Sequence, residues 1–336
     1  MEMREYIREF TLKDIVAARN PKVVAIGGGT GLSVILRGLK KYTNRLTAVV
    51  TVGDDGGSSG MLREDLGMLP PGDIRNCILA LADDENVMQS LFSYRFTEGG
   101  LEGHNFGNLF LAAMDGISQD FFDAVRRTSD VLQIKGRVLP VTLDDMILMG
   151  RLENEMIVEG ESHIPKAAEH AECKIKEIFL KTGRIEPLPE TVEAIKSADI
   201  IIIGPGSLYT SVIPNLLVNG IERAVEDNRG RKFYIGNIMT QPGETDTYTQ
   251  REHIQTLELH QKNKDRKLFN YAVVNNGDLP TNISGKYKKF KAKKVEIGER
   301  LEDYEYIEDD FIMVEDGRIR HDADLLARRI FEIYVK

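Results

Sequence analysis

The sequence predicts an α/β fold, a doubly wound, Rossmann-like and mostly parallel sheet with a helical insert. Three observations carry this prediction. Short β-branched runs are followed by a glycine-containing loop and then by apolar residues at helical spacing, and this unit occurs three times. Strands joined by a crossover helix pair in parallel with a right-handed connection in almost all sheets. A stretch rich in helix formers, at about 73–130, separates the first unit from the later two.

The first half contains one complete strand, loop and helix unit. Residues 1–20 interleave Glu and Arg with apolar residues, which predicts a helical N-terminal extension. Residues 22–26 form a short strand, and residues 32–39 after GGGTG carry apolar side chains at helical spacing. Residues 46–52 form the next strand of the parallel sheet. Within the insert, the pattern predicts helices at 74–82, 87–94 and 107–117.

The second half repeats the unit of strand, loop and helix after a segment with a different sequence pattern. Residues 146–160 alternate apolar and polar side chains around Glu153 and Asn154, which predicts a β-hairpin. The remaining sequence predicts strands at 198–203, 232–235 and 268–274, with helices at 216–225, 248–261 and 322–335. No long flexible linker interrupts this pattern, so residues 21–336 are expected to form one domain.

Composition excludes several classes of protein. The 336 residues include 44 Lys and Arg against 53 Asp and Glu, a net charge of −9, which argues against sequence-independent binding to nucleic acid or anionic membranes. Cys77 and Cys173 are far apart and have no metal-ligand spacing, so neither a disulfide framework nor a zinc site is indicated. No apolar run is long enough to cross a bilayer, and no signal peptide is recognisable. We therefore expect a cytoplasmic protein without a membrane span.

The glycine loop after the first strand is a candidate phosphate site. Gly28, Gly29, Thr30 and Gly31 lie where a strand ends and a helix begins, and free backbone N–H groups and the helix dipole favour an anion there. The loop is not a Walker A motif, because no Lys-Ser/Thr pair follows. It is not a full dinucleotide fingerprint either, because Leu32 stands at the third glycine position. A tight turn without a ligand is the alternative.

Acidic residues follow the second strand and begin the insert. Asp54 and Asp55, with Ser58 close behind, suit a ribose hydroxyl, a sugar or metal-assisted phosphate chemistry, and a solvated turn is the alternative. Asp73 follows two prolines and is either a helix cap or a third metal ligand. Arg75 and Asn76 then offer a guanidinium and an amide for phosphate oxygens.

Polar side chains also collect in three later loops. His104, Asn105 and Asn108 stand in a glycine-flanked loop whose amides suit hydroxyls or a base edge, although a structural role is equally open. The second glycine loop, GPGSLYTS, resembles another anion cradle. Its candidate ligand residues are Gly204, Gly206, Ser207 and Thr210, and the neutral amides at further strand ends are Asn237, Gln241 and Asn275.

These motifs together resemble a known family. GGGTGLS, TVGDDGGSSG, PPGDIRN, GHNFGN, GPGSLYTS, NIMTQPGET and GRIRHD occur in this order. The combination is similar to the gluconeogenesis factor family (YvcK-like) of the CofD-like superfamily, whose enzymatic members are 2-phospho-L-lactate transferases. The resemblance covers nearly all the chain from residue 27 to residue 322.

The resemblance implies a cytoplasmic bacterial regulator that binds UDP-sugars, notably UDP-N-acetylglucosamine. Such a regulator would link carbon supply and gluconeogenic growth to peptidoglycan precursor synthesis and cell shape. In the C-terminal third, Tyr287 could stack on uracil and Arg320 could contact a diphosphate, with a core tyrosine and a surface ion pair as alternatives. A protein partner in amino-sugar or peptidoglycan precursor synthesis is expected, and a homo-oligomer is consistent with a Rossmann-like core.

Two other functions remain open on sequence. A metal-dependent phosphotransferase of the 2-phospho-L-lactate transferase type would use a nucleotide diphosphate-linked donor, with Mg²⁺ held by Asp54, Asp55 and Asp73. A binding regulator requires no cofactor and no general base. An NAD-dependent oxidoreductase would keep the glycines and an acidic residue, but the incomplete fingerprint argues against it.

Overall fold

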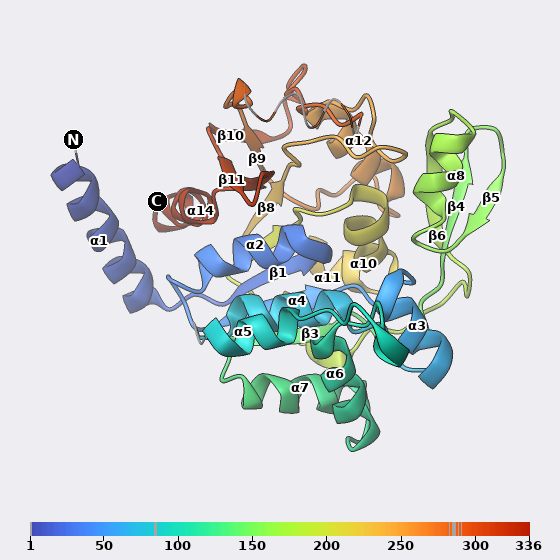
Figure 1. Cartoon of the computed structure of the whole chain (residues 1–336). Helices are drawn as coiled ribbons and strands as arrows, with labels where there is room; N and C mark the ends of the chain where they lie inside the picture. Colours follow the sequence, from blue (N-terminus) through green and yellow to red (C-terminus); the bar gives the residue numbers. More distant parts are fainter. Residues whose placement is uncertain (1, 84–85, 282, 284–286, 288, 290) are drawn as a thin grey trace.

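A parallel sheet of seven strands forms the centre of the molecule, and Figure 1 shows its arrangement in a computed structural model of the chain. The structure describes residues 2–83, 86–281, 283, 287, 289 and 291–336. The strand order is β10-β9-β8-β7-β1-β2-β3, and every neighbouring pair is parallel. The strands are β1 (Val23–Gly27), β2 (Leu46–Val50), β3 (Arg137–Pro140), β7 (Ile200–Ile203), β8 (Arg231–Ile235), β9 (Tyr271–Asn275) and β10 (Glu305–Asp309).

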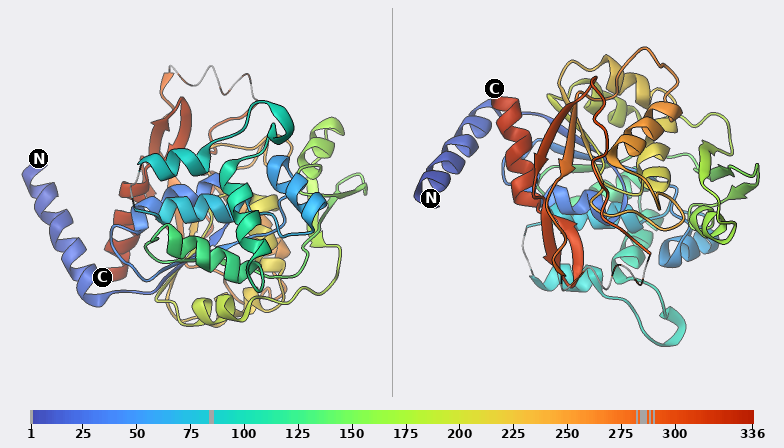
Figure 2. Two further views of the ribbon diagram at one scale, coloured as in Figure 1. Left: turned by 60° about the horizontal axis from the view of Figure 1, so that its bottom comes forward. Right: turned by 90° about the horizontal axis from the view of Figure 1, so that it is seen from above.

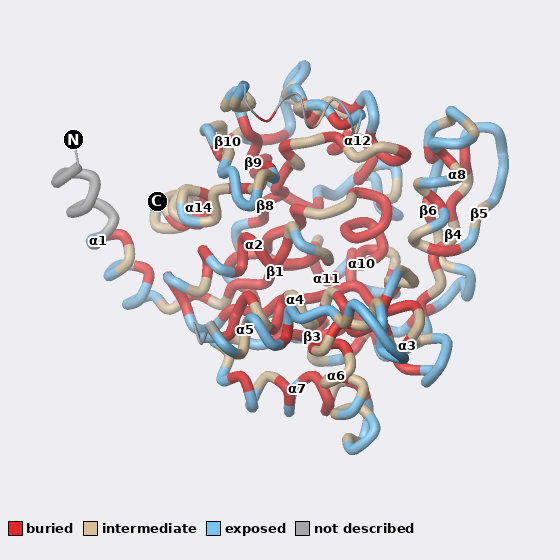
Figure 3. The backbone as a smooth tube through the Cα atoms, viewed as in Figure 1, coloured by how far each residue is buried: buried red, intermediate tan, exposed pale blue. Residues whose placement is uncertain are grey.

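The central strands bury both faces, as expected of a parallel sheet covered by helices on both sides. Val23 and Ala25 of β1 belong to one hydrophobic cluster, whereas Val24 and Ile26 belong to the other. Because alternate residues of a strand point to opposite faces, β1 joins the two clusters. Figure 3 shows that the buried residues concentrate in this sheet and in the helices on it. The predicted doubly wound, Rossmann-like class is therefore confirmed.

Helices cover the two faces unequally. The first cluster includes residues of α1 (Glu2–Arg19), α2 (Gly29–Leu39), α4 (Gly72–Leu81), α5 (Asn86–Ser93), α6 (Phe106–Gly116), α7 (Phe121–Val131) and α14 (Ala323–Val335). The second includes residues of α9 (Pro189–Lys196), α10 (Ile213–Leu217), α11 (Ile221–Asp227) and α12 (Gln250–His260). A short helical segment, η2 (Leu208–Val212), leads into α10, and η1 (Gly99–Leu101) lies between α5 and α6.

Three elements of the structure were not predicted from the sequence. The Gly/Ser segment after Asp55 is helical, forming α3 (Gly57–Leu66), because the φ of +49° at Gly57 lets the chain turn directly into a helix. The edge strand β3 was not predicted, since its four residues start with an exposed arginine and end with a proline. At the other edge, β10 was also missed because charged residues interrupt its apolar pattern.

A small lobe projects from one end of the molecule (Figure 1). It holds β4 (Leu148–Leu152), β5 (Ile157–Glu159), α8 (Ile164–His170) and β6 (Ile175–Leu180). β4 and β5 pair antiparallel at the place of the expected hairpin, and β6 adds a third strand on the other side of β4. The sequence had not indicated this third strand.

The N-terminal helix and the last helix lie together at the opposite end from the lobe, as all views in Figures 1 and 2 show. α1 occupies the part of the chain where a helical extension is expected, and the Arg19 guanidinium donates to the carbonyls of Tyr334 and Val335 at 3.3 Å each. Before α14, β11 (Ile312–Glu315) and β12 (Arg318–His321) form an antiparallel hairpin. None of the helices in the described ranges is both long and apolar enough to span a membrane.

Candidate functional site

A crevice opens at the carboxyl ends of β1 and β7, where the chain reverses its direction of strand addition. Ligands of doubly wound sheets bind at this type of switch point. The crevice has a volume of about 410 Å³. Its described lining residues are Gly28, Gly29, Thr30, Gly31, Val34, Asp54, Asp73, Glu161, Pro205, Gly206, Ser207, Ser211, Asn237, Ile238, Met239, Gln241, Ile319, Arg320 and His321.

The first glycine loop forms the floor of the crevice and the start of α2. Gly28, the N-cap of this helix, has no side chain that could cap it, and the Asp73 carboxyl accepts a hydrogen bond from the Gly29 N–H. Gly28, Gly29, Thr30 and Gly31 line the crevice at this helix start. A side chain at Gly28 would meet the Asp73 carboxylate at 2.6 Å, and one at Gly31 would meet the Pro205 carbonyl oxygen at 2.9 Å. These two glycines therefore let the two loops and α4 approach closely. The arrangement suits an anion at the helix N-terminus.

Amides brace the second glycine loop. The Asn237 amide donates to the Gly206 carbonyl oxygen at 2.8 Å, and its Oδ1 accepts from the Gly206 N–H at 3.4 Å. The Gln241 amide donates to the Ser207 hydroxyl at 2.5 Å. Asn237 and Gln241 both line the crevice, so they shape the loop and present polar atoms beside it.

Carboxyl groups form one wall of the crevice. Burial and the neighbouring Asp54 charge raise the pKa of Asp73 to about 7. Burial, followed by the charges of Asp54 and Asp73, raises the pKa of Glu161 well above its usual range. The Oε2 atom of Glu161 is buried and has no hydrogen-bond partner among the described residues. Near pH 7 Asp73 is therefore divided between its charged and protonated forms, and burial shifts Glu161 toward its protonated form. A protonated carboxyl can donate a hydrogen bond to a ligand.

Asp55 contacts the segment of the lobe around Ser162 and does not line the crevice. Its Oδ1 accepts from the Ser162 N–H at 2.8 Å, and a side chain at Gly160 would meet its Oδ2 at 2.4 Å. This contact fixes the segment that carries Glu161, immediately before Ser162. The two neighbouring aspartates therefore have separate positions: Asp54 borders the crevice, and Asp55 attaches the lobe.

The C-terminal hairpin supplies the cationic side. Arg320 is the only Lys or Arg among the described residues that line the crevice, and no ion pair is recorded for it within those residues. The next residue, His321, is buried with its Nε2 3.1 Å from the Gly236 carbonyl oxygen, and burial lowers its pKa to about 4. His321 is therefore neutral at pH 7. The Tyr287 hydroxyl accepts from the Ile319 N–H at 2.7 Å, so Tyr287 lies behind the crevice wall.

Six predicted ligand residues form a network beside the crevice and do not line it. Arg75 donates to Asn108 Oδ1 at 2.8 Å and to Asn76 Oδ1 at 2.7 Å. The Ser58 hydroxyl accepts from the Asn105 N–H at 3.2 Å and lies 3.4 Å from His104 Nδ1. This network ties α3, α4 and α6 together. The clustering predicted from sequence is present, but the side chains contact one another.

Three further predicted residues have structural contacts. The Thr210 hydroxyl donates to Glu244 at 3.4 Å inside the protein, where burial raises the pKa of Glu244 to about 7. The Asn275 Oδ1 accepts from the Phe311 N–H, and the Asn275 amide nitrogen donates to the Gly277 carbonyl oxygen. Gly204 precedes the crevice loop with a φ of +78° and does not line it.

Sequence reasoning missed Glu161 and His321. Glu161 follows the predicted hairpin at a position with no local signal, because only the folded lobe brings it to the sheet. His321 stands next to the predicted Arg320, so a signal for it was present. Ser211, a hydroxyl of the GPGSLYTS motif, was indicated by the sequence and lines the crevice. Among the described residues, no group of three or more His, Cys, Asp or Glu side chains is arranged to hold a metal ion.

A comparison with protein families shows which family the chain belongs to. The family model described as 2-phospho-L-lactate transferase CofD matches residues 23–312.

The chain belongs to the CofD family.

Relatives of this CofD family chain carry the name gluconeogenesis factor. One from Clostridium acetobutylicum is 51% identical over 317 residues, which are 94% of this chain and 70% of the relative. One from Bacillus subtilis is 45% identical over 319 residues, which are 94% of this chain and 98% of the relative. A crystal structure of a UPF0052 family protein from Bacillus halodurans is 45% identical, with a TM-score of 0.87 over 92% of this chain and 98% of that one. The resemblance seen in the motifs is confirmed, and these names support a role at the level of the family.

Proposed function

We propose that this protein binds a UDP-sugar, in the first place UDP-N-acetylglucosamine, in the crevice between β1 and β7. We further propose that it acts as a cytoplasmic regulator linking carbon metabolism and gluconeogenic growth to peptidoglycan precursor synthesis and cell shape. The observation that carries the binding proposal is the polarity of the crevice. A glycine loop at a helix N-terminus borders it, together with Arg320, which has no recorded ion pair among the described residues, and with carboxyl groups whose pKa values are raised by burial.

The diphosphate is assigned to the glycine loop and Arg320. The backbone N–H groups at the start of α2 and the Arg320 guanidinium are the groups around the crevice that stabilise negative charge. The second glycine loop adds the Ser207 and Ser211 hydroxyls.

The sugar is assigned to the carboxyl wall. Protonated Asp73 and Glu161 can donate to sugar or acetamide oxygens, and Asp54 can accept from a sugar hydroxyl. The orphan Oε2 atom of Glu161 supports this assignment, because a buried oxygen without a partner costs free energy until a ligand satisfies it.

Isothermal titration calorimetry with UDP-N-acetylglucosamine, with and without Mg²⁺, tests the proposal. We expect saturable binding, with the nucleotide-sugar recovered intact by chromatography. Arg320→Ala should weaken binding by about tenfold or more, because hydrogen bonds to charged groups contribute about 1.5–3 kcal/mol. The matched control is Arg318→Ala, which removes an exposed arginine from the same strand and should change the affinity less than about twofold. Equal losses in both variants, or no binding by the natural chain, would contradict the proposal.

The regulatory step requires the ligand to favour one conformation or surface, because a ligand with equal affinity for two states shifts neither. Co-purification with enzymes of amino-sugar and peptidoglycan precursor synthesis, compared with and without UDP-N-acetylglucosamine, tests this step. A partner retained in a ligand-dependent way supports regulation. Retention that ignores the ligand would limit the proposal to binding.

A phosphotransferase of the 2-phospho-L-lactate transferase type is the second candidate. The family description and the carboxyl groups of Asp54, Asp73 and Glu161 favour it. As arranged, these described residues do not form a three-ligand metal group, so we derive no step through Mg²⁺. Incubation with a guanosine diphosphate-linked phospholactate donor, a deazaflavin acceptor and Mg²⁺ tests it directly. Metal-dependent transfer to the deazaflavin would replace the regulator proposal with this one.

A further inference from the structure

Two cavities lie side by side at the amino-terminal ends of the parallel strands. The crevice lies at the opposite, carboxyl-terminal ends. The first, of about 310 Å³, is lined by residues that begin β1, β2 and β3. The second, of about 630 Å³, is lined by residues around the starts of β7 and β8. Both include Ser197, and the Lys22 N–H in the first donates to Asp199 of the second at 2.7 Å. The two cavities therefore form one continuous trough.

Each of the five strands above the trough begins at or near a basic residue. In spatial order these residues are Arg137 at β3, Arg45 before β2, Lys22 before β1, Lys196 before β7, and Arg229 with Arg231 at β8. All six line the trough. Because the strands are parallel, all six of these residues lie at the amino-terminal ends of the strands.

These cations lack carboxylate partners within the described part of the chain. The recorded ion pairs include many other Lys and Arg residues but none of these six. Arg45, Arg137 and Arg231 instead donate to neutral oxygens, at Asn20, Thr47 and Tyr271. In a chain with a net charge of −9, unpaired cations gathered at one edge are unexpected.

Helix dipoles explain part of this pattern. Cations are favoured at the C-terminal end of a helix, where Lys196 lies in the last turn of α9 and Arg229 follows the C-cap Asn228 of α11. Lys22, Arg45, Arg137 and Arg231 lie beyond the last turn of the helix before them, where the dipole effect has fallen off.

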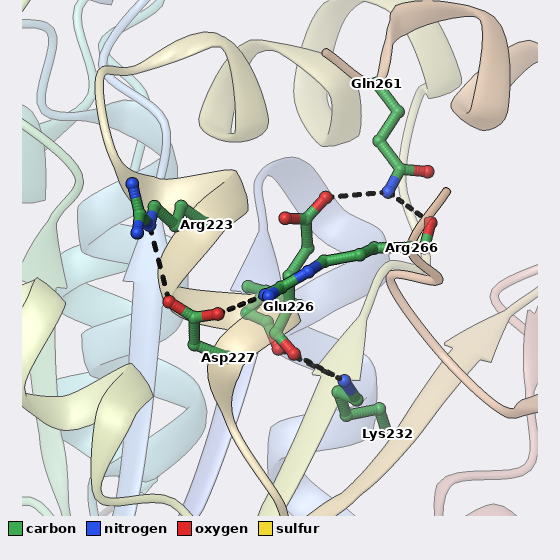
Figure 4. A network of polar contacts seen from close by, with 7 residues as sticks. Arg223, Glu226, Asp227, Lys232, Gln261 and Arg266 are labelled. Atoms are coloured by element: carbon green, nitrogen blue, oxygen red, sulfur yellow. Dashed lines mark hydrogen bonds and ion pairs between the residues drawn. The ribbon is translucent and has the colours of Figure 1, made fainter. Parts of the chain in front are cut away.

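Acidic residues of the trough do not cancel its charge. Figure 4 shows Asp227 held between Arg223 and Arg266, which come from outside the trough lining. Hydrogen bonding from Arg266 lowers the pKa of Asp227, so its charge is already balanced. Asp199 accepts the Lys22 N–H, and Glu193 is the remaining carboxylate of the lining.

The length of the trough indicates its occupant. Four steps between neighbouring strands separate β8 from β3, and at about 4.8 Å per step they span about 19 Å. One small anion covers a fraction of that distance, whereas an extended peptide at about 3.3 Å per residue covers it with about six residues. We infer that this trough binds an acidic segment of a partner protein in extended form. The surface is separate from the UDP-sugar crevice and does not depend on that assignment.

Fluorescence anisotropy with a labelled hexaglutamate peptide at low ionic strength tests the inference. The natural chain should bind the peptide, and triglutamate should bind about tenfold more weakly because it reaches only one cavity. Arg45→Glu and Arg229→Glu, one change in each cavity, should each weaken hexaglutamate binding, and the double variant should weaken it by about tenfold or more. Both side chains are exposed, so the fold should tolerate the changes, and unfolding curves check this.

The matched control is Lys166→Glu with Lys293→Glu. These exposed lysines also lack recorded ion pairs among described residues, and they stand on α8 and beside Thr240, away from the trough lining. The control makes the same change in net charge and should alter the affinity less than about twofold.

Three results would overturn the inference. The control could weaken binding as much as the trough variant, which would make the effect one of net charge. Tripolyphosphate could bind with the same dependence on Arg45 and Arg229 while hexaglutamate does not, which would indicate a small-anion site. Phosphatidylglycerol vesicles could bind in that dependent way without hexaglutamate binding, which would indicate a membrane surface.

Discussion

At the scale of single residues, Asp73 connects the stability of the protein to its crevice. Its carboxyl is raised from an ordinary pKa of 3.8 to about 7, first by burial and then by the charge of Asp54. The native state therefore holds a proton that the unfolded chain has released between those two pH values. Stability falls as the pH rises through this window and levels off above about 7.

Asp73→Asn should remove this pH dependence. The variant should gain stability relative to the natural chain, and the gain should be larger at about pH 8 than at about pH 5 by about 3 kcal/mol. Urea unfolding at both pH values measures the difference. Glu244 contributes a slope of the same sign to both proteins and cancels in the comparison. Glu161 loses the Asp73 charge that helps raise its pKa, so the variant also loses part of the slope from Glu161, which has the same sign. Asp65→Asn, at an exposed site, is the control, and an equal gain at both pH values for Asp73→Asn would contradict the argument.

A variant of Tyr287 distinguishes two roles for this residue, stacking on uracil and positioning Arg320. Its hydroxyl accepts a hydrogen bond from the N–H of Ile319, the residue before Arg320. Tyr287→Phe keeps the ring, so it should preserve affinity if the ring stacks on uracil. We expect instead a loss of about 1 kcal/mol in stability and a weaker UDP-N-acetylglucosamine affinity, because Arg320 loses its support.

Tyr306→Phe is the matched control for that experiment. It removes the acceptor for the Leu301 N–H, a contact of the same type in residues that do not line the crevice. It should cost similar stability and leave affinity unchanged. Unchanged affinity in Tyr287→Phe as well would show that the hydroxyl does not position Arg320.

At the scale of elements, the junction between α2 and the second glycine loop has no room for a side chain. Gly31→Ala would place its Cβ 2.9 Å from the Pro205 carbonyl oxygen. We expect a loss of about 1–3 kcal/mol in stability, with weaker UDP-sugar binding because the two loops separate. Gly116→Ala, at the end of α6 with open space around it, should be neutral or stabilising. Denaturant unfolding compares the two, and equal effects would contradict the close-packing argument.

The elements that carry strong local signals were predictable, and those that depend on distant partners were not. The glycine loops and the buried strands β1 and β7 follow from short patterns in the sequence. β3 and β10 lie at the two sheet edges, where charged or proline residues are tolerated and the apolar pattern is weak. The sequence indicated the floor of the crevice and Asp54, Asp73 and Arg320 in its walls, but not Glu161 or His321. Glu161 and His321 come from the lobe and the C-terminal hairpin, whose docking no local pattern reveals.

At the scale of the whole molecule, three separate regions meet at the crevice: the sheet loops, the lobe segment around Glu161 and the hairpin that carries Arg320. Hydrogen exchange with saturating UDP-N-acetylglucosamine should therefore slow in residues 29–33, 160–162 and 319–321. Helices α5, α6 and α7 supply none of the described lining residues and should exchange unchanged. Protection confined to those helices would contradict the assigned site.

The position of β1 has a consequence for how the protein is made. Its neighbours in the sheet are β2, which follows within about 25 residues, and β7, which begins at Ile200. While the ribosome is still translating the residues between them, β1 has an unpaired edge, and the face of α2 that packs on α14 is uncovered. Apolar surface and an open strand edge are the features that promote aggregation of partly folded chains. The nascent first half should thus depend on chaperones until β7 emerges to pair with β1 and α14 (Ala323–Val335) emerges to cover α2.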